Sequence, residues 1–405
     1  MNGMNFELSL EGQRMLGTFQ QLRKEKVAPR ALKHDKAATF PVDTFQDLHH
    51  AKLLELSIPK EYGGRDMRLH KEFLVEVMAT EELSKACSAT GQAFHNHSSA
   101  LEVITALGTD AQKRHFFGEV VTQGAVTGGW ASERTGKTLY DLKTRATPVD
   151  GGYLVNGEKF FSTNSGGARW GMLFIPPDGR SLNEFLIFII PMDAPGVSHL
   201  HDWNPLGQRA TTSGTTRYEN VFIPHENVLG GPGEYFEKCP LMGHHYQLGW
   251  AAVYAGIAGG ALEAGIEYVK TKTRPWAETS YERAVDDPYI QNHVADMSIA
   301  VEASRLLLYK ATRFMEAAAH DLSLRPEAAI AVYQAKVMAT EAALDISNRI
   351  FQVCGARAAA DAPQNGLDLF WRNARTFTLH DPVDYRRQRI GKYLLAGEAP
   401  PIGWY

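Results

Sequence analysis

The chain has 405 residues, of which 44% are hydrophobic and 22% are charged, and its formal net charge is −4. This composition is sufficient to bury a large core over two or three domains. Basic and acidic residues are spread along the chain without the basic stripe that binding to a phosphate backbone requires, so nucleic acid is not an expected partner.

The first 119 residues are expected to form an N-terminal helical domain. Apolar residues recur three and four positions apart in Met15–Leu22, Phe45–Leu56 and Phe73–Leu83, which is the spacing of amphipathic helices. The first residues are polar and acidic where a secretory signal needs a basic start and an apolar run. No stretch approaches the roughly 20 apolar residues of a membrane span. We therefore expect no membrane segment and a cytoplasmic location.

Residues 120–235 are expected to form a small central β-domain. Short runs with β character occupy Tyr153–Val155, Lys159–Thr163, Met172–Ile175, Phe185–Ile190 and Thr215–Phe222. Turn residues separate them, including Asp-Gly-Gly at 150–152 and Asn-Gly at 156–157. This spacing predicts a small antiparallel barrel or sandwich.

Residues 236–405 return to a helical pattern. Long helical blocks are expected at Tyr246–Lys270, Pro288–Asp321 and Pro326–Val353, the last two beginning with a proline at a helix start. Long helices with short links form antiparallel bundles. Their faces are rich in Ala, Leu, Ile and Val, so we expect a scaffold with few polar side chains directed inward.

Signals for a metal or a nucleotide-binding turn are weak. The pairs His49-His50 and His244-His245 and the segment His95–His97 lack the spacing that places two imidazoles on one ion, so no metal is expected. The glycine-rich segment 256–260 lies within a helical pattern and indicates close helix packing. Single, scattered cysteines occur at Cys87, Cys239 and Cys354, which gives no disulfide framework.

Four motifs then appear in order along the chain. They are IPKEYGG at 58–64, WASE at 130–133, NGEKFFSTN at 156–164 and GQRATTSGT at 207–215. Together they resemble signature segments of the acyl-CoA dehydrogenase superfamily over nearly the whole chain. The resemblance implies an α+β fold with an N-terminal helical domain, a central small β-barrel domain and a C-terminal four-helix bundle. It also implies a flavin between the β-domain and the bundle.

The second and third motifs contain the residues expected at the flavin ring. By resemblance, cofactor contacts fall on Trp130, Ala131, Ser132, Phe161, Thr163 and Asn164. The segment around Ala131 and Ser132 meets the pyrimidine edge, and Phe161 to Thr163 lie near O4 and N5. These residue types suit a ring that needs donors at its edge and flat apolar contact at its face. Ordinary strand chemistry for the hydroxyls and core packing for Phe161 are the competing interpretations.

Other cofactor residues are implied on the far part of the bundle. Arg274 occupies the position where the family places a basic residue on the flavin phosphate of a neighbouring subunit, a role that suits a guanidinium. Gln352, Gly355 and Arg357 resemble a turn that approaches the cofactor across the same interface. Ala356 replaces the second glycine of that turn, which favours FMN, with FAD as the alternative. A site completed in this way implies an oligomer, and the family implies a homotetramer.

The residues expected to carry the chemistry distinguish two branches of the superfamily. The base position of the dehydrogenases falls on Asp381, which is one methylene shorter than glutamate and is followed by Pro382, and residues 244–248 contain no carboxylate. Residues 371–385 and 400–405 instead resemble the flavin monooxygenase branch, which includes dibenzothiophene monooxygenase and the amino-sugar nitrososynthases. That branch implies reduced flavin from a separate NAD(P)H:flavin reductase, O2 and a C4a-hydroperoxyflavin.

For a monooxygenase, the resemblance assigns catalysis to His380, Asp381, Ser162 and Thr163. Ser162 or Thr163 holds N5, and His380, which titrates near neutrality, donates or relays a proton beside Asp381. Phe377 replaces a histidine of the desulfurising members, which predicts a more apolar pocket or a different oxygen acceptor. Phe94 and Trp203 are further candidates for the substrate wall.

The expected function is therefore a two-component flavin-dependent monooxygenase that oxygenates sulfur, nitrogen or activated aromatic carbon in a small organic molecule. Two other hypotheses stay open at this point. The first is an acyl-CoA dehydrogenase with Asp381 as its base. The second is a non-catalytic binding protein that kept the flavin fold.

Overall fold

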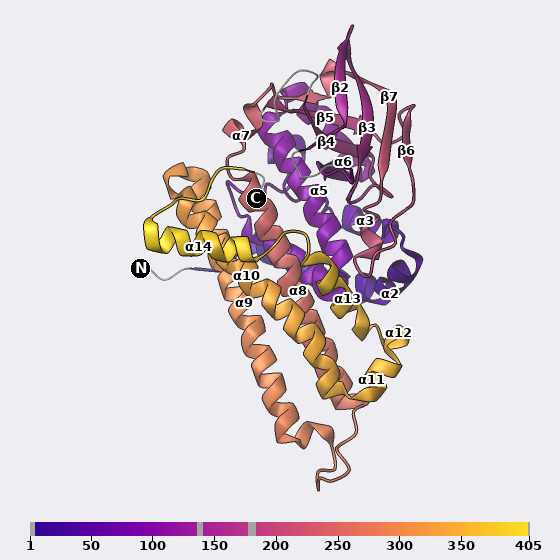
Figure 1. The fold of residues 1–405 in the computed structure, drawn as a ribbon, viewed down its shortest axis with the longest axis vertical. Coiled ribbons are helices and arrows are strands. Elements are labelled where there is room, and N and C mark those ends of the chain that lie inside the picture. The colour runs from indigo at the N-terminus through magenta and orange to yellow at the C-terminus, as the bar shows by residue number, and fades with distance from the viewer. Residues whose placement is uncertain (1–4, 136–140, 177–183, 404–405) are drawn as a thin grey trace.

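The computed structural model describes residues 5–135, 141–176 and 184–403, and Figure 1 shows a helical region between a β-domain and a long helical bundle. Helices of the N-terminal region are α1 Leu10–Leu22, α2 Ala28–Ala37, α3 Val42–His50, α4 Leu74–Ala86, α5 Ser88–Leu107 and α6 Asp110–Gln123. Polar caps set the starts of two of them. Thr109 and Gln112 form a capping box at α6, and Ser9 caps α1.

The β-domain consists of two sheets that share one core. Its strands are β1 Thr127–Trp130, β2 Arg145–Val149, β3 Gly152–Lys159, β4 Trp170–Ile175, β5 Leu186–Pro191, β6 Val197–His199, β7 Thr216–Pro224 and β8 Val228–Leu229. One sheet has the order β1-β4-β5-β8 and the other β2-β3-β7-β6. Buried residues from both sheets, including Trp130, Phe188 and Tyr218, pack in a common cluster, so the domain is a small sandwich.

Three details of the expected β-domain were wrong. The pair β1–β4 is parallel, so the domain is not purely antiparallel. Asn156-Gly157 is not a turn, because it lies inside β3 at a register shift where Gly157 has φ +136°. The strand expected at Lys159–Thr163 ends at Lys159, since Phe161 adopts a positive φ of 59° that a strand does not tolerate. The chain therefore leaves the sheet where it reaches the candidate site.

The remaining helices are α7 Glu234–Lys238, α8 Met242–Thr271, α9 Pro288–His320, α10 Arg325–Cys354, α11 Ala356–Ala360, α12 Ala362–Asn365, α13 Leu367–Phe377 and α14 Asp384–Ala396. The expected long helices α8, α9 and α10 are confirmed to within a few residues at each end. They pack side by side, and α13 packs against α8 and α10 to complete the bundle (Figure 1). Asp287 caps α9 ahead of Pro288, which explains the sharp start of that helix.

Glycines bring α8 close to α4, as the sequence indicated. A Cβ on Gly256 would lie 2.4 Å from Ser84 Cβ, and one on Gly260 would lie 2.1 Å from the Lys85 carbonyl oxygen. The two helices therefore approach with backbone against backbone, which joins the N-terminal helices to the bundle. Within the described ranges, no helix combines the length and the apolar character needed to cross a bilayer.

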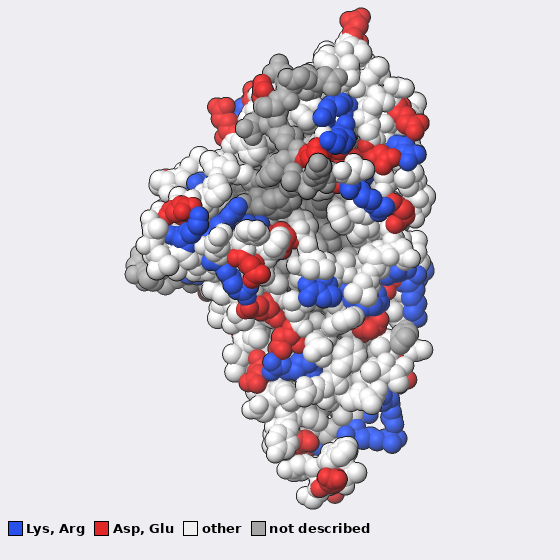
Figure 2. Space-filling view, in the orientation of Figure 1, with Lys and Arg blue, Asp and Glu red and all other residues white. Residues whose placement is uncertain are grey.

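Figure 2 shows basic and acidic side chains interspersed over the visible face. Inside the bundle the polarity differs from the sequence expectation. Lys336, Gln247 and His244 are all buried within helices α8 and α10 at 1% exposure or less. The expectation of a bundle with few inward polar groups was therefore wrong, and these groups lie next to the candidate site.

Candidate active site

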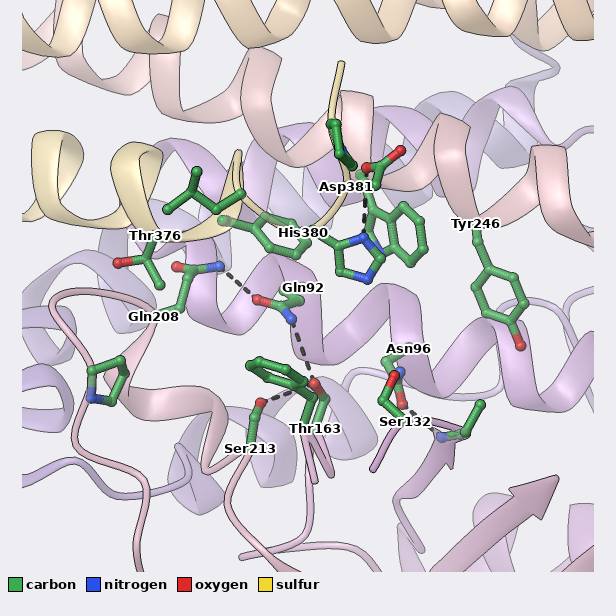
Figure 3. A pocket seen from close by; sticks show the side chains of 18 of the residues that line it. Gln92, Asn96, Ser132, Thr163, Gln208, Ser213, Tyr246, Thr376, His380 and Asp381 are labelled. Carbon is green, nitrogen blue, oxygen red and sulfur yellow. Dashed lines mark hydrogen bonds and ion pairs between the residues drawn. The ribbon is translucent and has the colours of Figure 1, made fainter. Parts of the chain in front are cut away.

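A cavity of about 840 Å³ lies between the β-domain and the bundle. Its walls come from α5, the segment after β1, the turn after β3, the start of α8, and the region joining α13 to α14 (Figure 3). Residues far apart in the sequence thus meet around one space. Cavities of this size, with mostly apolar walls and a few polar groups, are typical of small-molecule and cofactor sites.

One side of the cavity has a connected set of hydroxyl and amide groups. Thr163 Oγ1 and Ser213 Oγ are 2.9 Å apart, and Gln92 Nε2 is 3.4 Å from Thr163 Oγ1 (Figure 3). Gln208 Nε2 donates to Gln92 Oε1 at 2.7 Å. Asn96 Oδ1 accepts from the Gly129 N–H at 2.9 Å. The helix α5 and the β-domain are therefore joined by polar contacts at the cavity wall.

A buried ion pair supports the segment after β1. Lys159 Nζ donates to Glu133 Oε1 at 2.9 Å and to the Ala131 carbonyl oxygen at 3.0 Å, and its side chain is fully buried. Burial lowers the pKa of Lys159, while the Glu133 carboxylate opposes this shift. The pair fixes the backbone of Ala131, so that Ala131 and Ser132 face the cavity.

Aromatic rings cover two other walls. The His380 ring lies 3.9 Å from the Trp250 ring between centroids, and Tyr246 stacks on Trp250 at 5.9 Å. Across the cavity, Phe161 and Trp203 pack at 5.8 Å. The Phe161 side chain is 57% exposed, although most large apolar residues of the chain are buried. Phe161 therefore combines a positive φ of 59° with a ring that is exposed at the cavity wall.

Asp381 is the centre of a buried network behind His380. Lys336 Nζ donates to Asp381 Oδ1 at 2.9 Å, and Gln247 Nε2 donates to Asp381 Oδ2 at 3.3 Å. Arg386 binds Oδ2 through Nε at 3.0 Å and also through Nη2. His380 Nδ1 lies 3.6 Å from Asp381 Oδ1. The carboxylate is thus surrounded by donors from α8, α10 and α14.

The protonation states follow from these contacts. Burial would raise the pKa of Asp381, but the Lys336 ammonium, His380 and the Arg386 guanidinium hold it well below its usual value. Burial lowers the pKa of Lys336 to about 8, and Asp381 opposes that shift. Burial also lowers the pKa of His380, and Asp381 opposes it. Near neutral pH the network therefore contains an ionised Asp381, a protonated Lys336 and a predominantly neutral His380.

The structure places the residues expected from the sequence in three groups. Those that line the cavity are Ala131, Ser132, Phe161, Thr163, Trp203, Phe377, His380 and Asp381. Trp130, Ser162 and Asn164 lie behind its wall: Trp130 Nε1 donates to the Thr163 carbonyl oxygen at 2.7 Å, and Asn164 Nδ2 donates to the Ala93 and Thr127 carbonyl oxygens. Phe94 lies in the core against Phe19 at 5.4 Å and does not form part of the cavity wall.

Arg274, Gln352, Gly355 and Arg357 form the third group. They line a separate cavity of about 500 Å³ at the C-terminal ends of α8 and α10. Lys272 and His293 also line it. Gly355 has a φ of +82°, a conformation that favours glycine at this turn. Within one chain these four residues therefore line one cavity, and this cavity is separate from the 840 Å³ cavity described above.

Several site residues were not found from the sequence. Gln92, Asn96, Gln208, Ser213, Tyr246 and Trp250 line the cavity, and Lys336 and Gln247 form the network behind it. Lys336 offered one signal, since it is a lysine within the alanine-rich stretch AVYQAKVMA. A lysine in such a helix is ordinarily solvent-exposed, and its partner Asp381 is 45 residues away.

Family models match the chain in three consecutive parts: acyl-CoA dehydrogenase N-terminal domain over residues 10–123, middle domain over 128–221 and C-terminal domain over 248–385. The chain belongs to the acyl-CoA dehydrogenase family.

Its relatives place it in the monooxygenase branch of that family. It is 33% identical to a dibenzothiophene monooxygenase of Rhodococcus erythropolis over 94% of this chain and 93% of the relative. It is 31% identical to SfnC of Pseudomonas putida, a probable FMNH2-dependent monooxygenase, over 93% and 94% of the two chains. The solved structure of TdsC from Paenibacillus sp. A11-2 with FMN and indole has a TM-score of 0.89 and 27% identity, over 97% of this chain and all of that one.

Proposed function

We propose that this chain is the oxygenase component of a two-component system that uses reduced FMN from a separate reductase, and O2, to oxygenate a small organic molecule. The relatives support this proposal because SfnC is described as FMNH2-dependent and TdsC was solved with FMN. The main support from this chain is that Asp381, at the position that resembles the dehydrogenase base, is held as an ionised, ion-paired carboxylate.

The first cavity fits a flavin ring. A flavin needs hydrogen-bonding partners at its polar edge and flat contacts at its faces, and the cavity offers Ser132, Thr163 and Ser213 beside Trp250 and Phe161. We propose that Ala131, Ser132 and Thr163 hold the ring. When bound, reduced flavin supplies the two electrons that convert O2 into one oxygen atom for the substrate and one water.

Asp381 is poorly suited to remove a proton from carbon. A general base needs an accessible lone pair and a pKa near the working pH, whereas each oxygen of this carboxylate already accepts from Lys336, Arg386 or Gln247. Protonating it would leave two buried cations without their counter-charge. The arrangement therefore disfavours the acyl-CoA dehydrogenase alternative.

His380 is suited to the opposite task, which is to hold or deliver a proton. Its ring lies on the cavity against Trp250, and Asp381 is 3.6 Å from Nδ1. The carboxylate favours the tautomer with the proton on Nδ1, so Nε2 is available to a bound molecule. We propose that Nε2 of His380 accepts a hydrogen bond from the bound molecule and relays a proton to the oxygen that is reduced to water, the imidazole being protonated only transiently, with Thr163 at the polar side of the ring.

We propose sulfur as the atom oxygenated, on the basis of the dibenzothiophene monooxygenase relative. We also propose that the second cavity, with Arg274, Gln352, Gly355 and Arg357, meets the flavin phosphate of a neighbouring subunit. A homotetramer provides that neighbour. Three cationic side chains line this cavity, Lys272, Arg274 and Arg357, against the carboxylate of Asp287, and this excess of positive charge supports a phosphate there.

The test is rapid mixing of the anaerobically reduced FMN–protein complex with O2, followed by absorbance. We expect a transient band, distinct from the oxidised and reduced flavin spectra, that outlives the reoxidation of free flavin. His380→Ala should shorten its lifetime or abolish product. His50→Ala is the matched control, because His50 is exposed on α3 and does not line the cavity.

Reoxidation without a transient band, together with bleaching of the oxidised flavoprotein by an acyl-CoA thioester, would instead establish the dehydrogenase. Failure of both oxidised and reduced FMN to bind would establish a binding protein without flavin chemistry.

A further inference from the structure

The loop formed by the fourth motif, GQRATTSGT at 207–215, is held in an unusual conformation. It contains a 3₁₀-helical turn at Arg209–Thr211, flanked by Gln208 at φ 53° and Thr212 at φ 47°. The left-handed region is rarely adopted by a β-branched threonine, so the tertiary contacts of the loop must hold it there. Two side chains of this loop, Gln208 and Ser213, line the first cavity.

A chain of three hydroxyl groups runs from this loop to the cavity wall. Thr211 Oγ1 lies 2.8 Å from the Gln208 carbonyl oxygen and 2.7 Å from Ser213 Oγ. Ser213 Oγ lies 2.9 Å from Thr163 Oγ1 (Figure 3). Thr163 and Ser213 line the cavity, whereas Thr211 is fully buried and does not line it. Each hydroxyl group has one hydrogen to donate, so the direction of each hydrogen bond can be worked out.

The carbonyl group of Gln208 fixes the direction of the whole chain. Two oxygen atoms 2.8 Å apart need a hydrogen between them, and a carbonyl has none, so Thr211 donates to Gln208. The single hydrogen of Thr211 is then used, so Ser213 donates to Thr211. For the same reason Thr163 donates to Ser213. The hydrogens of Thr163 and Ser213 are therefore both directed away from the cavity.

Two glutamines act on Thr163 in the same sense. Gln208 Nε2 faces the Ser88 carbonyl oxygen at 3.4 Å and donates to Gln92 Oε1 at 2.7 Å. Because the Gln92 oxygen already accepts, the Gln92 amide nitrogen is the group directed to Thr163 Oγ1, at 3.4 Å. Among the described residues, Thr163 Oγ1 thus accepts from Gln92, donates to Ser213 and keeps one lone pair. Toward a bound molecule this oxygen is an acceptor.

We propose that Thr211 and Ser213 are positioning residues that hold Thr163 as an acceptor toward the flavin ring, so that the site binds reduced FMN more tightly than oxidised FMN. This inference rests on the proposed function, in which Thr163 lies at the polar side of the ring. Reduced flavin carries a hydrogen on N5, whereas oxidised flavin has a lone pair there. The remaining lone pair of Thr163 accepts from the N5 hydrogen and is repelled by the N5 lone pair.

Such a preference serves a protein that exchanges its flavin with a separate reductase. The flavin must arrive reduced and leave oxidised, and tighter binding of the reduced form favours both steps. The preference also raises the midpoint potential of bound FMN above that of free FMN, by about 30 mV for each factor of ten between the two affinities. Binding and redox potential therefore give two independent measurements of the same property.

The experiment measures the dissociation constant of oxidised FMN by fluorescence titration, that of reduced FMN by anaerobic titration, and the midpoint potential of bound FMN. We expect reduced FMN to bind at least ten-fold more tightly. Thr211→Val should lower the ratio of the two affinities roughly 3- to 10-fold, the usual effect of one hydrogen bond between neutral groups. The valine leaves Ser213 without its acceptor, so Ser213 or Thr163 turns its hydrogen to the cavity. Ser213→Ala should act in the same direction, because it removes the acceptor of Thr163.

Three comparisons separate this effect from a loss of structure. Thr211→Ser keeps the hydroxyl group and should retain the ratio. Thr312→Val is the matched control, because Thr312 is also fully buried and its hydroxyl donates to the Leu308 carbonyl oxygen within α9, so the ratio should not change. With 5-deaza-FMN, in which a C–H group replaces N5, the ratio should be the same in the unchanged protein and in Thr211→Val.

Equal affinity for the two redox states, or an equal loss of both affinities in Thr211→Val, would overturn the inference even if the protein oxygenates a substrate. A changed ratio for 5-deaza-FMN in Thr211→Val would also overturn it, because N5 would then not be the group that Thr163 contacts. A preference for reduced FMN that depends on Thr211, without any oxygenation, would support the role of the hydroxyl chain and refute the monooxygenase function.

Discussion

Replacing Asp381 by asparagine removes the negative charge from the centre of the buried network. Asp381 is 7% exposed, and its carboxylate is shared by Lys336 at 2.9 Å and by Arg386 at 3.0 Å. The amide leaves both cations buried without a counter-charge. Removing one partner of a buried ion pair costs about 3–5 kcal/mol, so we expect Asp381→Asn to lower the free energy of unfolding by about that amount.

The assay is urea unfolding of the purified protein followed by far-UV circular dichroism at pH 7, beside Asp384→Asn. Asp384 lies three residues after Asp381, and its side chain is 89% exposed. The free energy of unfolding of Asp384→Asn should therefore stay within about 0.5 kcal/mol of that of the unchanged protein. Asp381→Asn should also lower the pKa of His380 further, because in the unchanged protein the carboxylate opposes the lowering caused by burial, and the variant loses that opposition. The acid limb of the pH–activity profile should then move to lower pH. A fully stable Asp381→Asn protein with an unmoved profile would refute this reasoning.

Three further predictions test the surroundings of the site. Lys159→Met should destabilise the protein by about 3–5 kcal/mol and weaken FMN binding, as measured by unfolding and fluorescence titration, because the Glu133 carboxylate loses its counter-charge while its side chain stays buried. Gly256→Ala should lower the free energy of unfolding by about 1–3 kcal/mol, because the added Cβ would lie 2.4 Å from Ser84 Cβ. Gly17→Ala in α1 should instead raise it by up to about 1 kcal/mol, because the added Cβ has no atom within 4 Å. Burial raises the pKa of Glu102 from 4.5 to about 8, so between these pH values the folded state retains a proton that the unfolded state releases. The free energy of unfolding should therefore fall by about 1.4 kcal/mol for each unit of rising pH in this range. A series of urea unfolding curves at different pH should show this fall, and the same series for Glu102→Gln should not.

The helices and the order of the domains were predictable because their signals are local. The start of α9 is encoded by Asp287 and Pro288 in adjacent positions, and the long α10 follows from one uninterrupted pattern. The cavity was partly predictable, because the motifs that contain Ser132, Thr163 and His380 resemble family segments. The end of β3 was not, since a positive φ at Phe161 follows from tertiary packing and not from β-propensity.

Lys336 shows why the rest of the site was not accessible from sequence. Most of its neighbours along α10 are apolar, and this pattern gives no indication of which tertiary partner a lysine meets. The partners Gln247 and Asp381 lie 89 and 45 residues away and are brought together only when α8, α10 and the α13–α14 connection pack. Buried charges are expensive unless they are paired, so such a lysine is interpretable only after its counter-charge is located.

The same lysine also explains how one position can serve opposite chemistry within a family. A carboxylate that removes a proton from carbon must be able to accept that proton, and its surroundings must tolerate the neutral acid. Here the neutral acid would face Lys336 and Arg386 together, so the protein holds the group as a permanent anion. A permanent anion beside Nδ1 of His380 orients the imidazole and favours the tautomer with the proton on Nδ1. In the proposed function, the chemistry at this position changes from proton abstraction by a carboxylate to proton placement by a histidine, which is the requirement when O2 is reduced.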